Sequence, residues 1–225
     1  MSLPRPWDSF DAYLFDIDGT LVHCTDAVHY FAFCDALSAV AGRPLNLDGV
    51  IAHGNTDVGI LRDAFALAGI HEDQWRPRLA EICEQMCLQV ERNKAGLCAT
   101  VLPQVREVLL HLRNRGATLS VATGNLERIG RQKLAAANLL EFFHTGAWSD
   151  SFERRVDVFC HAIEQVRRAT RPGAAILAIG DTPADIQAGR ANHLPVMAVA
   201  TGIYTFEQLQ DEKPSLCLHS FAELF

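Results

Sequence analysis

The stretch that decides the fold reads Phe15-Asp16-Ile17-Asp18-Gly19-Thr20. The apolar run 12–15 that leads into it is typical of a short buried parallel strand. Two carboxylates then follow one residue apart, where they repel each other and resist removal from water. Such a pair is tolerated when a cation lies between the carboxylates or when one of them holds a proton; an acidic turn is the ordinary alternative. Because ligands of open α/β sheets bind beyond the carboxyl ends of strands, Asp16 and Asp18 are candidate functional residues.

The charge balance of the chain excludes some classes of partner. The 225 residues include 27 acidic and 20 basic side chains, which gives a formal net charge of −7. This balance argues against nucleic acid or an anionic membrane as a partner. A small anionic substrate remains compatible with it, because a metal and local cations override the global field. The apolar runs are also far shorter than the roughly 20 residues that span a bilayer.

The cysteines and the N-terminus indicate the compartment. The seven cysteines are an odd number without C-x-x-C spacing, which favours reduced thiols over a disulfide framework. The N-terminal stretch 1–10 lacks the apolar segment of a signal peptide. We therefore expect a cytoplasmic protein, and the sequence does not indicate its oligomeric state.

The second half of the chain alternates between strand and helix patterns. Strand-like runs occupy residues 118–122, 142–147, 174–179, 195–200 and 216–218. Helix-like runs occupy residues 104–115, 126–137, 156–170, 184–191 and 221–225. This repeat predicts an α/β fold, a Rossmann-like doubly wound and mostly parallel sheet.

One interval is too long for this repeat. Residues 16 to 123 separate the first two strand ends, whereas a crossover needs about 30 residues. The patterns predict helices over 23–41, from a cap at Thr56 or Asp57 to Gly69, and over 72–94, with no convincing strand. We therefore expect an inserted all-helical cap domain at residues 22–98 and a core domain formed by residues 1–21 and 99–225.

Two polar segments follow other predicted strands. Thr123-Gly124-Asn125 offers a hydroxyl and backbone N–H groups that would grip an anion, unless Asn125 only caps the next helix. In Gly180-Asp181-Thr182-Pro183-Ala184-Asp185, Thr182 and Asp185 read as a helix cap. The cap leaves Asp181 unexplained, a carboxylate at the end of a buried strand.

A basic pair precedes the predicted helix at 156–170. Arg154 and Arg155 place positive charge where a helix disfavours it, so they are either solvated charges or ligands of an anion. All four segments can face one crevice, where they offer carboxylates, an anion donor and a cation. Hard oxygen ligands suit Mg²⁺, and the set matches phosphoryl transfer.

With these segments in place, the sequence resembles the haloacid dehalogenase superfamily, and within it the aspartate-nucleophile phosphatases. The first motif, DxDGT, is similar to residues 16–20, the second to residues 123–125, and the fourth, GDTxxD, to residues 180–185. The segment Gly54-Asn55-Thr56-Asp57 is similar to a cap segment of phosphoglycolate-phosphatase-like members. The third motif departs from the family, because Arg155 stands where lysine is usual and Arg154 competes for the same role.

The resemblance implies a role for each residue. Asp16 would attack phosphorus and form an aspartyl-phosphate, while Asp18 would keep a proton near neutral pH for the leaving oxygen and later deprotonate water. The implied Mg²⁺ ligands are Asp16, Asp18 through its backbone carbonyl, Asp181 and, directly or at one remove, Asp185. The implied contacts to the phosphoryl group are Thr123, Gly124, Asn125 and Arg155, with Lys133 and Arg128 as the next cations to consider.

The expected substrate is a small phosphorylated metabolite, phosphoglycolate or a sugar phosphate by family analogy. Candidates for the cap side of the pocket are His23, Asn55, Thr56 and Arg62. A phosphomonoesterase is the leading function. A phosphomutase of the same superfamily is the alternative, and a non-catalytic binding or scaffold protein on the same fold is the third.

Overall fold

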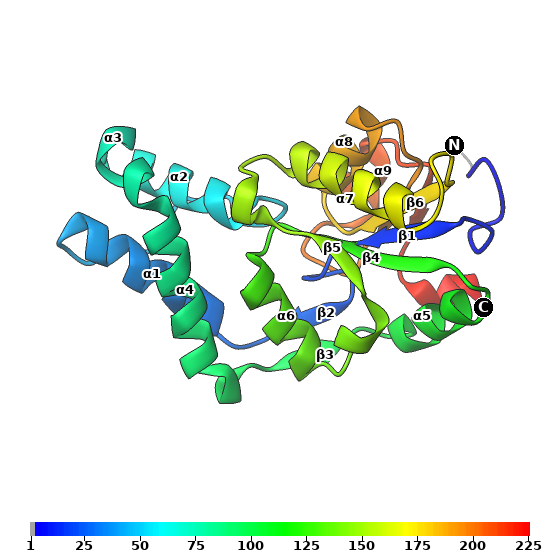
Figure 1. The fold of residues 1–225 in the computed structure, drawn as a ribbon, viewed down its shortest axis with the longest axis horizontal. Helices are drawn as coiled ribbons and strands as arrows, with labels where there is room; N and C mark the ends of the chain where they lie inside the picture. The colour runs from blue at the N-terminus through cyan, green and yellow to red at the C-terminus, as the bar shows by residue number, and fades with distance from the viewer. Residues whose placement is uncertain (1–2) are drawn as a thin grey trace.

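The computed structural model describes residues 3–225, and within this range six strands form one parallel sheet (Figure 1). The sheet consists of β1 (Ala12–Phe15), β4 (Thr118–Ala122), β5 (Thr145–Ala147), β6 (Ile176–Gly180), β7 (Val196–Val199) and β8 (Leu216–Leu218), in the spatial order β5-β4-β1-β6-β7-β8. The first strand is central, because Phe15 pairs with Val121 of β4 on one side and with Ile179 of β6 on the other. The predicted α/β class is confirmed, and the three central strands end at the same level.

Helices cover both faces of this sheet (Figure 1). Alternation along β1 divides the core, since Tyr13 and Phe15 face one layer while Ala12 and Leu14 face the other. The first layer contains α5 (Val105–Asn114) and α6 (Glu127–Ala136), and the second contains α7 (Arg155–Ala169), α8 (Pro183–Ala191) and α9 (Phe206–Asp211). The sequence patterns had not indicated α9. The strand expected over 142–147 is shorter, because a 3-10 turn at Leu140–Phe142 precedes it.

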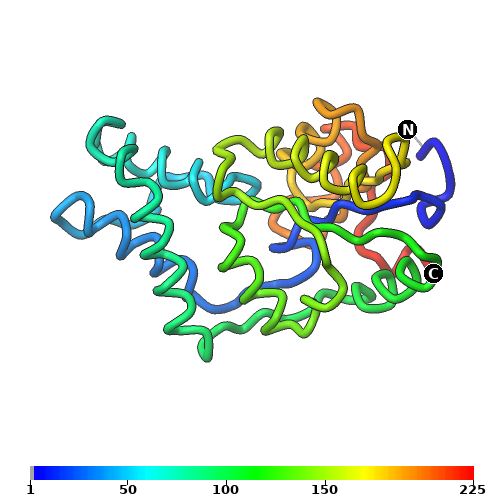
Figure 2. Tube along the Cα trace, in the orientation of Figure 1, coloured from blue at the N-terminus to red at the C-terminus, as the bar shows by residue number. Residues whose placement is uncertain are grey.

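The segment between β1 and β4 is largely helical, as expected. It contains α1 (Val28–Ala41), α2 (Asp57–Leu67), α3 (Glu72–Trp75) and α4 (Leu79–Arg92), with 3-10 turns at Arg76–Arg78 and Lys94–Gly96. These helices share an apolar cluster with Leu126 and Ile129 near the start of α6, and in this cluster Phe65 stacks on Trp75 with ring centroids 5.2 Å apart. The helices lie beyond the carboxyl ends of the central strands, on the left in Figure 2. Domain boundaries at residues 22 and 98 stay a prediction.

Both connections to this helical segment are strands. The expectation of a helix from residue 23 is wrong, because β2 (Val22–Cys24) pairs with β3 (Ala99–Val101) in an antiparallel ribbon and α1 begins only at Val28. Pairing across the ribbon outweighs helix propensity, since Val22 is buried opposite Val101 while His23 is exposed. The outgoing and returning chains therefore run side by side.

Two helix starts near the sheet edge agree with the sequence patterns. Thr56 caps α2 by accepting a hydrogen bond from the backbone N–H of Gly59 at 2.9 Å. Thr182 caps α8 in a reciprocal capping box with Asp185. Among residues 3–225 we find no helix with the length and apolarity needed to cross a bilayer.

Candidate active site

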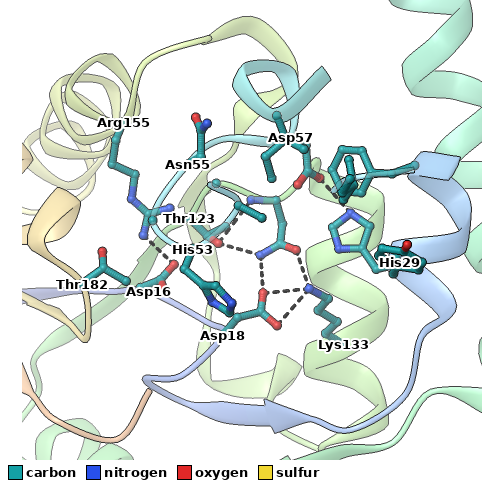
Figure 3. Close-up of a pocket in the computed structure, with 18 of the residues that line it drawn as sticks. Asp16, Asp18, His29, His53, Asn55, Asp57, Thr123, Lys133, Arg155 and Thr182 are labelled. Atoms are coloured by element: carbon teal, nitrogen blue, oxygen red, sulfur yellow. Dashed lines mark hydrogen bonds and ion pairs between the residues drawn. The ribbon is translucent and has the colours of Figure 1, made fainter. Parts of the chain in front are cut away.

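A cavity of about 260 Å³ lies where the carboxyl ends of the central strands meet the helical segment (Figure 3). On the sheet side, the structure brings together seven of the eight residues expected in the site: Asp16, Asp18, Thr123, Gly124, Asn125, Arg155 and Asp181. The eighth, Asp185, is fully buried behind this lining. The opposite side is formed by α1, α2 and the loop between them.

Arg155 connects two of the carboxylates. Its Nη2 lies 2.6 Å from Oδ1 of Asp16 and 2.6 Å from Oδ1 of Asp185, and its Nε donates to the same Asp185 oxygen at 3.0 Å. Only 8% of the Arg155 side chain is exposed. A buried guanidinium between two carboxylates offsets their mutual repulsion and keeps Asp16 oriented toward the cavity. Figure 3 shows the side chain reaching from α7 to Asp16.

Arg154 has no such position. Its Nε and Nη2 each lie 2.8 Å from a carboxylate oxygen of Asp157, one turn along the helix, and 69% of its side chain is exposed. Of the two arginines, only Arg155 therefore faces the site.

Asp16, Asp181 and Asp185 form a buried acidic cluster. One carboxylate oxygen from each lies within 4.8 Å of the others. Burial raises the pKa of Asp16 to about 6, against the opposing effect of Arg155 and with a further increase from Asp185. Burial, Asp16 and Asp185 raise the pKa of Asp181 well above its ordinary value, although Thr20 donates to it at 2.8 Å. Buried carboxylates that repel one another would be stabilised in their ionised form by a hard divalent cation such as Mg²⁺.

Two glycines enclose Asp181, and sequence reasoning missed one of them. A Cβ at Gly19 or at Gly202 would overlap the Asp181 carboxylate. The Oγ1 of Thr201 donates to the backbone carbonyl of Gly19 at 2.6 Å, which ties the loop after β7 to the first motif. A signal was available, because the run Val-Ala-Thr-Gly occurs both at 121–124 and at 199–202. The segment 199–202 is therefore a further part of the site.

Asp18 does not join the acidic cluster with its side chain. Its carboxylate accepts from Nζ of Lys133, 2.9 Å from Oδ1 and 2.7 Å from Oδ2, and from Nδ2 of Asn125 at 2.8 Å. Lys133 also donates to Oδ1 of Asn125 at 2.8 Å, so the three side chains form a closed network. Asn125 thus orients Asp18 and does not cap α6, whose N-cap is Leu126.

The contacts of Asp18 oppose the proton that the resemblance assigns to it. Burial favours the neutral acid, but the charge of Lys133 and hydrogen bonds from Lys133 and Asn125 outweigh it and lower the pKa of Asp18 to about 2. These contacts favour the ionised form of Asp18, and the raised pKa is that of Asp16. Lys133 lies on α6, and only 6% of its side chain is exposed. The sequence analysis had considered Lys133 only as a further cation for the phosphoryl group.

The loop before α2 docks onto the sheet edge. The backbone N–H of Asp57 donates to the carbonyl of Gly124 at 2.7 Å, and Oδ2 of Asp57 accepts from the N–H of Leu126 at 2.8 Å. Nε2 of His29 lies 3.2 Å from the same Oδ2. Thr56 donates to the carbonyl of Glu153 at 2.6 Å. These contacts close the cavity on the helical side, and sequence reasoning had assigned no role to His29.

Only one of the expected cap-side residues lines the cavity. Asn55 does so, whereas His23, Thr56 and Arg62 are outside its described lining. Arg62 instead pairs with Glu153 at 2.8 Å and with Asp63 at 2.7 Å. Glu153 also receives Arg76 at 2.6 Å, so this cluster joins the helical segment to the loop before α7.

Comparison with known proteins agrees with this geometry. Residues 10–193 match the model of the haloacid dehalogenase-like hydrolases. The chain belongs to this family. It is therefore a haloacid dehalogenase-like hydrolase.

The similar proteins include phosphatases. The chain is 27% identical over 214 residues to the phosphoglycolate phosphatase of Pseudomonas syringae pv. syringae, covering 94% of this chain and 77% of that one. It is 28% identical over 192 residues to that of Rhodobacter capsulatus, covering 85% and 84%. The crystal structure of CbbY from Rhodobacter sphaeroides in complex with phosphate has the same fold, with a TM-score of 0.66, 19% identity and 96% of each chain covered. The chain is thus similar to phosphoglycolate phosphatases along most of its length.

Proposed function

We propose that this hydrolase is a magnesium-dependent phosphomonoesterase that acts on a small organic phosphate through an aspartyl-phosphate. The observation that supports it most strongly is Arg155, whose Nη2 lies 2.6 Å from Asp16 beside the buried acidic cluster. A nucleophilic carboxylate, a cation for the phosphoryl oxygens and a set of hard oxygen ligands meet at one cavity. Phosphoryl transfer needs this combination of positioning and charge neutralisation.

Each residue of the sheet edge has a part in this proposal. Asp16 attacks phosphorus as the bond from phosphorus to the leaving oxygen breaks, and the leaving oxygen takes up a proton from water beside the partly exposed Asp18 carboxylate. Thr123 and the backbone N–H groups of residues 124 and 125 bind phosphoryl oxygens together with Arg155, which stabilises the charge that develops on them. Asp18, ionised through Lys133, then takes a proton from the water that hydrolyses the aspartyl-phosphate.

The acidic cluster has the chemistry of a Mg²⁺ site. The residues that would hold the ion are Asp16 and Asp181, with Asp185 close by and the Asp18 backbone carbonyl as a further oxygen. Bound there, Mg²⁺ would keep both carboxyls ionised and neutralise charge on the phosphoryl group. Gly19 and Gly202 leave no room for a side chain beside Asp181, so their backbones fix the position of its carboxylate.

A screen of phosphorylated metabolites in the presence of Mg²⁺ tests this function. The assay measures free phosphate and isomerised product together, with a generic aryl phosphate as reference. We expect release of stoichiometric phosphate from at least one small phosphomonoester. Isomerisation without phosphate release would identify a phosphomutase instead, and binding without either product would identify a non-catalytic protein. A cytoplasmic location, supported by seven free thiols, belongs to the same proposal.

A further inference from the structure

The helical side of the cavity is mostly apolar. The polar residues of its described lining are Asp57, Asn55 and the two histidines His29 and His53, and the rest are apolar or aromatic side chains and one glycine. We call the following residues the distal wall: Tyr30, Phe33, Leu47, Ala52 and Ile60. The distal wall faces the leaving group of any phosphomonoester whose phosphoryl group lies at Asp16, because it closes the end of the cavity opposite the sheet edge.

The cations of the described lining are already paired with carboxylates at the sheet edge. Arg155 contacts Asp16 and Asp185, and Lys133 contacts both oxygens of Asp18. Arg62, the cation expected on the helical side, points away and pairs with Glu153 and Asp63. A second anionic group on the substrate would therefore find neither lysine nor arginine among the residues that line the distal end.

The remaining charge near the distal wall is unfavourable to an anion. Asp57 is buried, and its Oδ2 lies 3.2 Å from Nε2 of His29, so this imidazole nitrogen already faces a carboxylate (Figure 3). His29 also stacks on Phe33, with ring centroids 4.9 Å apart. His53 is exposed and is the other imidazole of the described lining. Burying an unpaired carboxylate beside Asp57 costs more free energy than burying an apolar group of equal size.

From this arrangement we infer that the substrate's leaving group is uncharged and largely apolar, so that the phosphoryl group is the substrate's one anionic group. The inference rests on the proposed phosphomonoesterase function and names its substrate class. The inference disfavours 2-phosphoglycolate, the substrate that the names of the relatives state, as a substrate of this chain. That compound carries a carboxylate at the position that the distal wall would enclose.

Two matched pairs of compounds test this inference. The first pair consists of 2-phosphoglycolate and its neutral isostere 2-phosphoglycolamide, compared by kcat/KM with Mg²⁺ present. The second consists of the phosphonates 3-phosphonopropionate and butylphosphonate, which cannot be hydrolysed and are compared by calorimetric Kd. We expect the neutral member of each pair to be favoured at least tenfold. An equal or better result for either carboxylate compound overturns the inference.

Variants of the distal wall locate the effect. Leu47 is partly buried on the loop between α1 and α2 and lines the cavity, so Leu47→Arg supplies the missing cation. We expect Leu47→Arg to reduce the preference for butylphosphonate over 3-phosphonopropionate at least fivefold. Leu67→Arg is the matched control, because Leu67 is 63% exposed on α2 outside the cavity lining, and it should leave the preference unchanged. An equal response of both variants overturns the assignment of the distal wall.

These measurements separate the inference from the proposed function. If the wild-type protein hydrolyses the aryl phosphate but favours 2-phosphoglycolate, the inference fails and the phosphomonoesterase function stands. If His53→Ala then abolishes the preference for 2-phosphoglycolate, His53 is the partner of the substrate carboxylate. If no phosphomonoester is hydrolysed, the proposed function fails, and the phosphonate Kd values still decide which leaving-group chemistry the distal wall accepts.

Discussion

Lys133 donates to both carboxylate oxygens of Asp18, at 2.9 Å and 2.7 Å. The lysine is buried, whereas 40% of the Asp18 side chain is exposed. Asp18 thus combines a fixed, ionised carboxylate with access to the cavity. This pairing keeps Asp18 ionised and able to accept a proton, but the lowered pKa weakens it as a base and makes the protonation of the leaving group the more demanding half of the proposed reaction.

The first prediction concerns Asp18→Asn. The amide cannot take a proton from water, so the aspartyl-phosphate should accumulate. With an aryl phosphate, whose leaving group needs little protonation, we expect a burst of about one equivalent of phenol followed by turnover slowed by about 100-fold or more. Rapid-quench measurement of the released phenol and of the phosphorylated protein checks this. Asp16→Asn is the control and should give no burst, and a burst there would contradict the nucleophile's assignment.

The second prediction separates the two arginines. Arg155→Ala removes the cation beside Asp16 and should reduce kcat about 100-fold or more, which corresponds to about 3 kcal/mol. Arg155→Lys should recover most of this loss, because lysine retains the charge although it cannot reproduce the forked contact to Asp185. Arg154→Ala, the matched control on an exposed neighbour, should stay close to wild type. The reverse pattern would place the third motif one residue earlier.

The third prediction is metal dependence. Removal of divalent ions with EDTA should abolish hydrolysis of an aryl phosphate, and Mg²⁺ should restore it. Ca²⁺ should inhibit, because its larger and more flexible coordination shell disturbs the in-line geometry. Full activity in EDTA would refute the assignment of the acidic cluster as a metal site.

The fourth prediction uses the loop after β7. In Gly202→Ala the new Cβ would overlap the Asp181 carboxylate, so Asp181 must move out of the acidic cluster. We expect at least a tenfold loss of kcat and a higher Mg²⁺ concentration at half-maximal activity. Gly173→Ala is the control, since a Cβ there meets nothing within 4 Å. An unchanged Mg²⁺ requirement in Gly202→Ala would show that Asp181 does not bind the ion.

The fifth prediction concerns stability and pH at the opposite end of the sheet. The Oδ2 atom of Asp11 accepts hydrogen bonds from the backbone N–H of Ala175 at 2.7 Å and from Nη2 of Arg171 at 2.8 Å, and both interactions lower the pKa of Asp11. The resulting stabilisation is complete above the unfolded pKa of about 3.9 and is lost as pH falls through the lower folded value.

Asp11→Asn should therefore lower the free energy of unfolding at pH 7, by about 1 kcal/mol. The difference from wild type should shrink as the pH falls below about 4. Urea unfolding at several pH values measures both. Asp211→Asn, an exposed carboxyl at the end of α9, should show a smaller difference. A deficit of Asp11→Asn that persists unchanged at pH 2 would contradict the linkage.

Much of the sheet could be predicted because its pattern is local. Apolar runs followed by polar turns identified β1, β4, β6, β7 and β8, and the capping residues of α8 were readable from Thr182 to Asp185. The meeting of Asp16, Asp181 and Arg155 also followed, since the ends of neighbouring parallel strands share one edge.

The remaining features depend on long-range contacts. Strand β2 was mistaken for the start of a helix because its pairing partner, β3, lies far along the chain. The ionisation of Asp18 depends on Lys133, a residue that reads only as one more helix charge until α6 is placed against β1. The same holds for His29, whose contact with Asp57 requires α1 and α2 to pack together.

The β2–β3 ribbon has a consequence for engineering. Val22 pairs with Val101 and Cys24 with Ala99, and paired Cα atoms of antiparallel strands lie about 5 Å apart. Residues 25–98 thus form a segment whose two ends meet on the ribbon, so it can be exchanged as one unit. Chimeras could exchange this whole segment between relatives and graft a new leaving-group pocket onto an unaltered set of reactive carboxylates.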